Sequence, residues 1–581
     1  MTGAVANLQP GTDALVVYGE PQSGKTEMMI CLTARLLDIG TRVIVHLLND
    51  SVDLLTQNLQ RFRQSQLSPA PMLAQMLPGT PAALPREMVI FCKKNRRDLE
   101  RLMARLRGGG ITSVLVIDDE ADYATPNARV NAGEVTRING LVRTLLGPEG
   151  RYIGVTATPA RLDLNNTFNN ATERWVRFPA HGAYDGQDTF FPQDLSTIRY
   201  RLRLLPGGAG REEARTALIR FLVTAAFLNV VDHPERPENY TMLVHTSGRQ
   251  ADHQQDMTII QEVFSALDAQ GTPGFDDVVQ QVYETAQSLY PGADARSVTR
   301  YVVATAARKA LIVLNSARDR MAWGSEVAVP TSPFTVIVGG NIISRGVTFP
   351  NLLAMFFTRD VRTRLQQDTY IQRARMFGVR GAYLPHFELT IPQPLFEDWR
   401  RCFVYHRLSL NSIDEELGAP VWLGDARISV ASSASIDHST VNLDKGEMSF
   451  ALFDLDAATR SALDELVRAA PSDAATLERM SERVGEASLP QFLINFVRTI
   501  APNGAASLAI HTSSSVAGYA ARPGTDLDSI TRRRGFMGRP QLEEGQFPNA
   551  VHHFKIFYNA GSRARVFYKY TERVTFTQNQ G

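Results

Sequence analysis

A glycine-rich loop near the start of the chain has the residue types of a phosphate-binding site. Residues 19–26 read G-E-P-Q-S-G-K-T and match the pattern G-x-x-x-x-G-K-T. In such a loop the backbone N–H groups surround phosphate oxygens at a helix N-terminus. We expect Lys25 to reach the β- and γ-phosphates of a nucleotide and the Thr26 hydroxyl to bind magnesium. The other loop residues expected at the nucleotide are Gly19, Gln22, Ser23 and Gly24.

An acidic cluster follows a short apolar strand later in the chain. Residues 114–117 (V-L-V-I) lead directly into 118–122 (D-D-E-A-D). Because ligands of open α/β sheets bind at the carboxyl ends of the strands, these carboxylates are placed for catalysis. We expect Asp119 to hold magnesium and Glu120 to orient or deprotonate the attacking water. A solvated acidic turn is the alternative. The phosphate loop earlier in the chain favours the catalytic interpretation.

The elements that must position these residues alternate between short apolar strands and helical stretches, which predicts parallel sheets with crossover helices. The chain has 581 residues, too many for one hydrophobic core. We expect a first α/β domain at 1–180 and a second at 181–410 that carries a helical insertion at about 250–308. Residues 411–581 are expected to form a separate domain of mixed α+β structure. The polar, glycine-containing segment that begins at His181 is interpreted as the connector.

Two motifs of the first domain resemble motifs II and III of superfamily 2 helicases. They are D-E-A-D at 119–122 and T-A-T-P at 156–159. The resemblance implies two tandem RecA-like P-loop NTPase lobes that bind ATP and magnesium in the cleft between them. It also implies that Thr156 and Thr158 link the nucleotide site to a nucleic-acid groove. Gln9 lies where helicases often keep an adenine-reading glutamine, although an incidental glutamine is the simpler interpretation.

The second half of the chain supplies segments that resemble motifs V and VI of the same helicases. Residues 339–348 (G-G-N-I-I-S-R-G-V-T) resemble motif V. Gly346 is therefore expected at the nucleotide, and Arg345 and Thr348 at the nucleic acid.

Residues 372–380 (Q-R-A-R-M-F-G-V-R) resemble motif VI, whose glutamine and arginines reach across the cleft to the γ-phosphate. We expect Gln372, Arg375 and Arg380 to take part in catalysis, with Arg375 the first candidate for the arginine finger. An arginine finger raises the rate by roughly 10³–10⁵. A solvated helix face is the alternative for these arginines.

Two departures distinguish the chain from ordinary RNA helicases. Thr348 stands near the position of an acidic residue in motif V, and Met376 and Phe377 make motif VI bulky. The combination S-R-G-V-T with Q-x-x-R-x-F-G-x-R resembles the Z1 domain of bacterial helicase-like proteins linked to restriction and phage defence. In particular it resembles the helicase-like subunit of CglI-type ATP-dependent restriction enzymes, which implies a separate nuclease subunit as partner.

Two basic segments are candidates for nucleic-acid contact. Lys93 and Lys94 follow a first-domain strand where helicases keep phosphate-contacting loops, although a solvated helix face is equally plausible. Near the end of the chain, basic and aromatic residues interleave at Arg563, Arg565, Phe567, Tyr568, Lys569, Tyr570 and Arg573. That segment either binds DNA or packs as an edge strand against a partner, and we favour the strand.

Several other site types have no support in the sequence. His553 and Lys555 form the H-x-K of phospholipase-D-type nucleases, but Ala560 stands where the required aspartate should be. The three cysteines lie far apart, without zinc or disulfide spacing. No membrane span and no secretory leader are apparent, so we expect a cytoplasmic protein. The net charge of +1 gives no sign for or against DNA binding.

Two functions fit these residues. The first is an ATP-dependent double-stranded DNA translocase or helicase-like subunit of a restriction or defence complex. The second is an ATP-driven assembly switch that binds a nuclease partner without movement along DNA. A P-loop kinase for a small molecule is disfavoured, because such kinases have no motif V or VI. The first two differ in whether ATP turnover depends on DNA.

Overall fold

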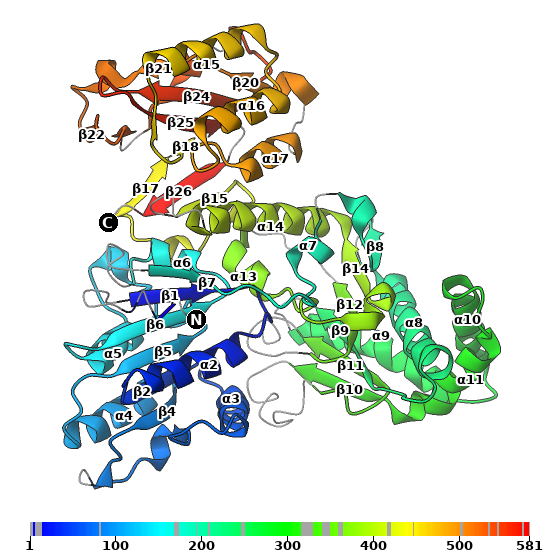
Figure 1. Ribbon diagram of the computed structural model, residues 1–581. Helices are drawn as coiled ribbons and strands as arrows, with labels where there is room; N and C mark the ends of the chain where they lie inside the picture. Colours follow the sequence, from blue (N-terminus) through cyan, green and yellow to red (C-terminus); the bar gives the residue numbers. More distant parts are fainter. Residues whose placement is uncertain are drawn as a thin grey trace.

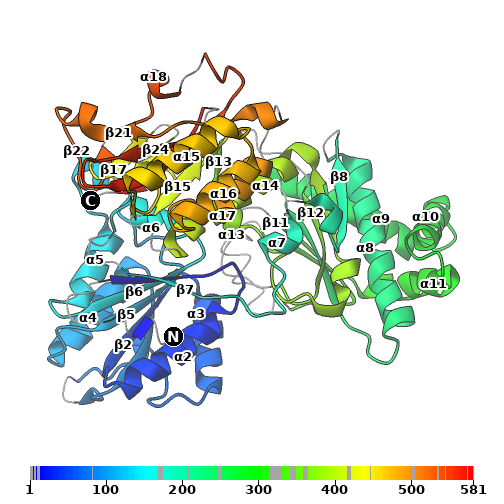
Figure 2. The same ribbon diagram turned by 45° about the horizontal axis from the view of Figure 1, so that its top comes forward.

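The computed structural model has three parts in chain order, two α/β lobes that face one another and a third domain placed over both (Figure 1). The second view shows the same arrangement, with helix α13 between the lobes (Figure 2). The structure describes residues 4–5, 8, 14–80, 83–167, 174–192, 194–206, 209–245, 250–314, 329–339, 349–357, 364–414, 420–444, 447–499, 504–532, 535–542, 545–571 and 574–579. Gln9, Arg345, Gly346, Thr348 and Arg573 lie outside these residues.

The first lobe is built on a seven-stranded parallel sheet in the order β3-β4-β2-β5-β6-β1-β7. The strands are β1 (Ala14–Tyr18), β2 (Val43–Leu48), β3 (Met72–Leu73), β4 (Met88–Lys93), β5 (Leu115–Asp119), β6 (Arg151–Thr156) and β7 (Arg174–Arg177). They are apolar along most of their length because helices cover both faces of the sheet. One face carries α2 (Lys25–Asp38) and α3 (Val52–Gln64), and the other carries α4 (Arg96–Gly108) and α5 (Arg137–Leu146).

The second lobe repeats this plan with a six-stranded parallel sheet in the order β10-β11-β9-β12-β14-β8. The strands are β8 (Arg201–Leu205), β9 (Tyr240–His245), β10 (Ala310–Leu314), β11 (Phe334–Gly339), β12 (Leu352–Phe357) and β14 (Glu388–Pro392). One face packs on α13 (Gln367–Gln372) and the long helix α14 (Gln393–Asp414). The chain therefore has the two tandem RecA-like lobes that the motifs predict.

The helical insertion predicted in the second lobe is present. It consists of α9 (Gln250–Asp268), α10 (Pro273–Leu289) and α11 (Ala295–Thr305), which pack with α8 (Arg211–Phe227) on the outer face of the sheet. Among the described helices, only Arg211–Asp232 is long and apolar enough to cross a membrane, and 67% of its apolar window is buried inside the lobe. Burial of that extent is what the core helix of a globular lobe shows.

The third domain has the mixed α+β structure that the sequence predicts. A three-stranded sheet, which we call the C-terminal sheet, contains β15 (Val421–Gly424), β26 (Thr575–Asn579) and β17 (Val441–Asp444). A second sheet runs in the order β18 (Glu447–Ser449), β25 (Arg563–Tyr570), β24 (His552–Tyr558) and β20 (Leu508–Ile510). Helices α15 (Ala457–Ala469), α16 (Ala474–Val484) and α17 (Gln491–Thr499) cover it.

The basic and aromatic segment near the chain end is a strand, but not an edge strand. It forms β25, which pairs with β24 on one side and with β18 on the other. Tyr568 is fully buried there. The edge-strand expectation is wrong because alternation of basic and aromatic residues does not tell which strands lie on either side.

Candidate active site

The glycine-rich loop connects the end of β1 to the start of α2, as its pattern predicts. Gly24 adopts a left-handed conformation (φ 95°) directly before the helix begins at Lys25. The Lys25 ammonium lies over the loop and donates to the carbonyls of Gly19 (3.3 Å) and Glu20 (2.7 Å). Burial lowers the pKa of Lys25, and the carboxylates of Asp119 and Glu120 offset part of that effect.

The side chains around the loop leave polar groups available for a ligand. The Ser23 hydroxyl is buried and has no hydrogen-bond partner among the described residues. Thr26 makes a long hydrogen bond of 3.4 Å to Asn58 Oδ1. An orphaned buried hydroxyl is costly unless a ligand or water satisfies it. The loop therefore fits an oxygen-rich anion such as a phosphate chain.

The acidic turn after β5 is fixed by a buried lysine. Lys94 Nζ lies 2.9 Å from Asp118 Oδ1, and both side chains have no exposed surface. The same ammonium donates to the backbone carbonyls of Asp119 (2.9 Å), Glu120 (2.9 Å) and Tyr123 (3.0 Å). Lys94 thus sets the path of the turn, which passes through a positive φ of 49° at Glu120.

The expectation that Lys94 contacts nucleic acid is therefore wrong. Successive residues at a strand end point to opposite sides, and at this position Lys94 points into the lobe. Lys93 stays nearer the surface, where its ammonium pairs with Asp50 (3.1 Å) and Asp98 (3.5 Å). A nucleic-acid contact by Lys93 remains a prediction.

The carboxylates of the turn face the glycine loop. Burial raises the pKa of Asp119 to about 7, with the neighbouring Glu120 carboxylate as the second cause. Glu120 Oε2 accepts a hydrogen bond from Asn49 Nδ2 at the end of β2. Two carboxylates brought together beside a hydroxyl are an oxygen donor set suited to magnesium.

Threonines of the T-A-T-P segment connect this turn to the second lobe. Thr156 Oγ1 donates to Asp122 Oδ1 (2.7 Å), and the Thr158 N–H donates back to Thr156 Oγ1 (2.9 Å). Gln372 Nε2, at the end of α13, donates to Asp122 Oδ2 (2.7 Å) and to Thr158 Oγ1 (3.1 Å). The Asp122 carboxylate therefore joins three motifs across the cleft. Sequence reasoning assigned Asp122 no role, and its only signal was its place in D-E-A-D.

The two motif VI arginines differ. Arg375 lines a cavity of about 310 Å³ together with Lys25, Thr26, Asp119 and Glu120, and Gln22 Nε2 donates to its carbonyl (3.3 Å). Arg380 is buried (3% exposed), and its guanidinium donates to the carbonyls of its own turn, at Arg375 (2.7 Å), Met376 (2.7 Å) and Phe377 (2.8 Å). Arg380 is not among the residues that line this cavity, and a contact between Arg380 and a phosphate stays a prediction.

The connector between the lobes contacts residues on both sides of the site, which its polar composition did not indicate. Tyr184 donates its hydroxyl to the Pro21 carbonyl of the glycine loop. Asp185 and Gly378 exchange two backbone hydrogen bonds (2.9 and 3.0 Å), and the Arg380 N–H donates to Asp185 Oδ2 (3.3 Å). The connector therefore contacts the loop on one side and motif VI on the other.

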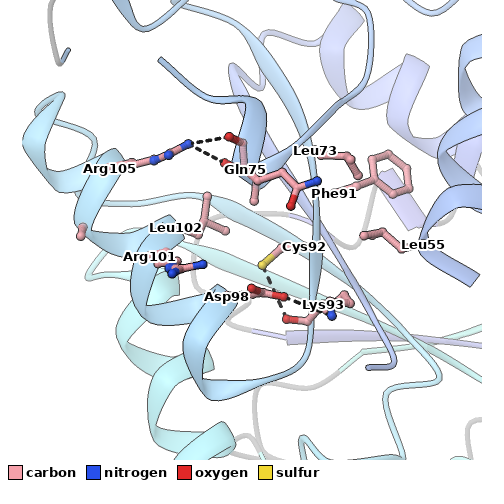
Figure 3. Close-up of a pocket in the computed structure, with 12 residues that line it drawn as sticks. Leu55, Leu73, Gln75, Phe91, Cys92, Lys93, Asp98, Arg101, Leu102 and Arg105 are labelled. Carbon is pink, nitrogen blue, oxygen red and sulfur yellow. Dashed lines mark hydrogen bonds and ion pairs between the residues drawn. The ribbon is translucent and has the colours of Figure 1, made fainter. Parts of the chain in front are cut away.

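A larger cavity of about 450 Å³ lies away from the glycine loop, between α3, β4 and α4 of the first lobe (Figure 3). Figure 3 shows Arg101 beside Cys92 and Asp98 at one end of it. Lys93 is the only residue predicted for the site that lines it. Size alone therefore does not identify the reaction centre, which the convergent polar groups of the smaller cavity mark instead.

Residues 213–416 match the Z1 domain family. Among solved structures, the ATP-dependent Type ISP restriction-modification enzyme LlaBIII bound to DNA is 13% identical, with a TM-score of 0.37, 67% of this chain covered and 27% of that enzyme's chain. Dbp5 of S. cerevisiae bound to RNA and ADP BeF3 is 11% identical (TM-score 0.37), with 69% of this chain and 86% of that chain covered.

The Escherichia coli DEAH/RHA helicase HrpB is 14% identical (TM-score 0.33), with 68% of this chain and 43% of that chain covered. No curated protein matches the chain. Residues 213–416 of the second lobe therefore match the Z1 domain, as the resemblance implied. The finer resemblance to CglI-type enzymes stays a prediction.

Proposed function

We propose that this protein is an ATPase that hydrolyses ATP between its two lobes and uses the cycle to move on double-stranded DNA as the helicase-like subunit of a restriction or defence complex. One observation carries the proposal. Gln372 of the second lobe donates to both Asp122 and Thr158 of the first, beside the cavity that Lys25, Glu120 and Arg375 line. A site shared by two lobes couples nucleotide chemistry to lobe movement.

Binding of ATP falls to the glycine loop. Backbone N–H groups of residues 22–26 at the start of α2 surround the β- and γ-phosphates, and the helix N-terminus favours their negative charge. Lys25 exchanges its contacts with the Gly19 and Glu20 carbonyls for phosphate oxygens. The buried Ser23 hydroxyl gains the partner that it lacks among the described residues.

Magnesium fits beside the loop, where Thr26 and Asp119 would hold it. When bound, the ion neutralises negative charge on the phosphates. The raised pKa of Asp119, to about 7, reflects a buried carboxyl beside another carboxylate, the setting in which a cation is favoured. Glu120 accepts the proton of the attacking water or orients it, and Asn49 orients Glu120.

Arg375 stabilises the charge that develops on the γ-phosphoryl group. It is buried beside Lys25 and its own position is set by the turn that Arg380 holds. Gln372 connects the second lobe to motif III through its hydrogen bond to Thr158, so closure of the lobes changes the position of motif III. We infer that DNA binding favours this closed arrangement, so that hydrolysis is faster on DNA.

The DNA substrate and the separate nuclease subunit rest on the sequence resemblance to Z1 proteins of restriction systems. The match at residues 213–416 supports that class. Gln9, Arg345, Gly346 and Thr348 keep their proposed roles at the adenine, the nucleotide and the nucleic acid on the same basis. Within the described residues no group of His, Cys, Asp and Glu gathers as a metal cluster.

The test is ATP hydrolysis by the purified chain with no nucleic acid, duplex DNA, single-stranded DNA or RNA. We expect duplex DNA to raise the rate several-fold and Lys25→Ala to abolish it. Arg300→Ala, an exposed arginine on α11, is the matched control and should behave as the wild type. Stimulation by RNA alone would contradict the restriction assignment. A rate that no nucleic acid changes, but a nuclease subunit does, would favour the assembly switch instead.

A further inference from the structure

The short helix α6 (Ala160–Leu164) joins motif III to the C-terminal sheet. It begins directly after Thr158 and Pro159. Asp163, which is 1% exposed, accepts a hydrogen bond at Oδ2 from Trp422 Nε1 of β15 (2.6 Å). Its backbone carbonyl accepts another from Asn579 Nδ2 of β26 (2.6 Å). Figure 1 shows β17 and β26 beside α6. Two strands of the C-terminal sheet therefore contact one residue of α6.

The contact continues on both sides of Asp163. The Asp437 N–H donates to the Leu164 carbonyl (2.7 Å), and Asn165 Nδ2 donates to the Ser435 carbonyl (2.8 Å). Trp422 and Leu164 are fully buried in an apolar cluster that includes Tyr18, the last residue of β1 before the glycine loop. Leu410 and Ile413 of α14 complete this cluster. The C-terminal sheet thus contacts the residues that flank both the glycine loop and motif III.

Helix α6 is also contacted by the second lobe. Arg161 faces Asp368 of α13 (4.0 Å), and Gln372 of the same helix donates to Thr158 Oγ1 (3.1 Å). Thr158 lies only five residues before Asp163 in the chain and is separated from α6 by a proline, whose fixed φ limits independent motion. A shift of α6 therefore changes the distance between Thr158 and Gln372.

We propose that Asp163, held by Trp422 and Asn579, is a positioning residue for motif III, so that the third domain sets the rate of hydrolysis through α6. The inference rests on the proposed ATPase function and names a means of its regulation. None of the three side chains lines the cavity at the glycine loop. They act by fixing the position of Thr158 relative to Gln372 across the cleft.

The hydrogen bond from Trp422 to Asp163 depends on the position of the accepting oxygen more than on a negative charge on the carboxyl. Burial raises the pKa of Asp163 to about 7, and the Trp422 hydrogen bond lowers it only in part. An asparagine keeps the accepting oxygen and the size of the side chain. Asp163→Asn should therefore retain the hydrogen bond from Trp422. Trp422→Phe keeps an aromatic ring at this position but removes the N–H donor.

The experiment measures kcat and KM for ATP with saturating duplex DNA, together with thermal stability. Trp399→Phe is the matched control, because Trp399 is also fully buried but its Nε1 has no hydrogen-bond partner among the described residues. We expect Trp422→Phe and Asn579→Ala to lower kcat about tenfold, with KM within about twofold, because each removes one hydrogen bond to a buried oxygen of Asp163, the first at the carboxyl and the second at the backbone carbonyl. Asp163→Asn and Trp399→Phe should keep kcat near the wild-type value.

Two results would overturn the inference. One is a wild-type kcat in both Trp422→Phe and Asn579→Ala. The other is an equal loss in Trp399→Phe, which would make the effect one of core packing rather than positioning. Failure of the proposed function would be detected separately, by comparing ATP hydrolysis of the wild type with that of Lys25→Ala. Equal rates in these two proteins would show that the glycine loop is not the hydrolytic site, whatever the variants of the Asp163 contact do.

Discussion

Lys94 in the first lobe and Arg380 in the second are buried cations on opposite walls of the cleft, and each donates to three backbone carbonyls of a turn that carries a proposed catalytic residue. They differ in origin. Lys94 follows β4 and pairs with Asp118 on β5, so it links two strands of one sheet. Arg380 belongs to the turn that it stabilises and contacts the connector through its backbone N–H.

This difference indicates how the walls behave. The first wall of the cleft carries Glu120 and is part of the sheet of the first lobe, so its geometry is set when that lobe folds. The second wall carries Arg375 and depends on local contacts and on the connector, whose Tyr184 also contacts the glycine loop. A nucleotide that moves the loop therefore affects the second wall more than the first.

The largest expected effect is on the first wall. Lys94→Met leaves the fully buried Asp118 carboxylate without its cation. We expect a loss of about 3–5 kcal/mol in the free energy of unfolding, because an uncompensated buried charge remains. Urea denaturation measures it. Lys93→Met is the control and should cost less than about 1 kcal/mol, since the Lys93 pairs are partly exposed. Equal losses would contradict the distinction.

A smaller loss is expected on the second wall. Arg380→Ala removes hydrogen bonds to carbonyls but leaves no buried carboxylate unpaired. We expect a loss of roughly 2–3 kcal/mol in the free energy of unfolding. Arg380→Lys should restore little, because one ammonium cannot reproduce the planar fork of donors. Full rescue by lysine would mean that charge, rather than geometry, holds this turn.

Stability should also depend on pH through Asp163, a buried carboxyl near neither cation. Its pKa rises from 3.8 to about 7 on folding, so the folded state binds the proton more tightly than the unfolded state. The stabilisation is complete below pH 3.8 and is lost as the pH rises toward 7. The expected slope is up to about 1.4 kcal/mol per pH unit. Asp163→Asn should flatten the profile between pH 5 and 7, measured by urea titration, and an unchanged slope would refute the assignment.

The smallest effect tests the connector. Asp185→Ala removes long side-chain contacts to the Arg380 N–H (3.3 Å), Thr189 (3.4 Å) and Arg199 (3.4 Å). Thermal unfolding should show a loss of about 0.5–1 kcal/mol. The backbone pair between Asp185 and Gly378 remains in this variant. A loss as large as that of Arg380→Ala would show that the connector side chain, not the arginine, governs the second wall.

The sequence predicted what is local in the chain. The loop at 19–26, the turn at 118–122 and the alternation of strands and helices depend on neighbouring residues, and the structure has these elements where the pattern indicates them. The resemblance to motif VI placed Gln372 across the cleft, but its contact with Asp122 was not predictable. Gln372 and Asp122 are separated by 250 positions, and only the folded lobes bring them together.

The side-chain direction of basic residues was the other limit. The sequence identified Lys94 and Arg380 as positively charged groups near the site but not that both point inward. At Lys94 a signal was present, since adjacent residues of a strand point to opposite sides and only one of Lys93 and Lys94 can face solvent. At Arg380 there was none, because the turn that it closes has no regular period.

The central claim is that residues from both lobes form one hydrolytic site, and Arg375→Ala tests it most directly. ATP hydrolysis at saturating ATP and duplex DNA would be compared with the wild type, with nucleotide affinity measured in parallel by a fluorescent ATP analogue. The account predicts a fall in kcat of about 10³-fold or more with affinity within about threefold. A kcat close to that of the wild type would contradict it, because the second lobe would then contribute no charge to the reaction.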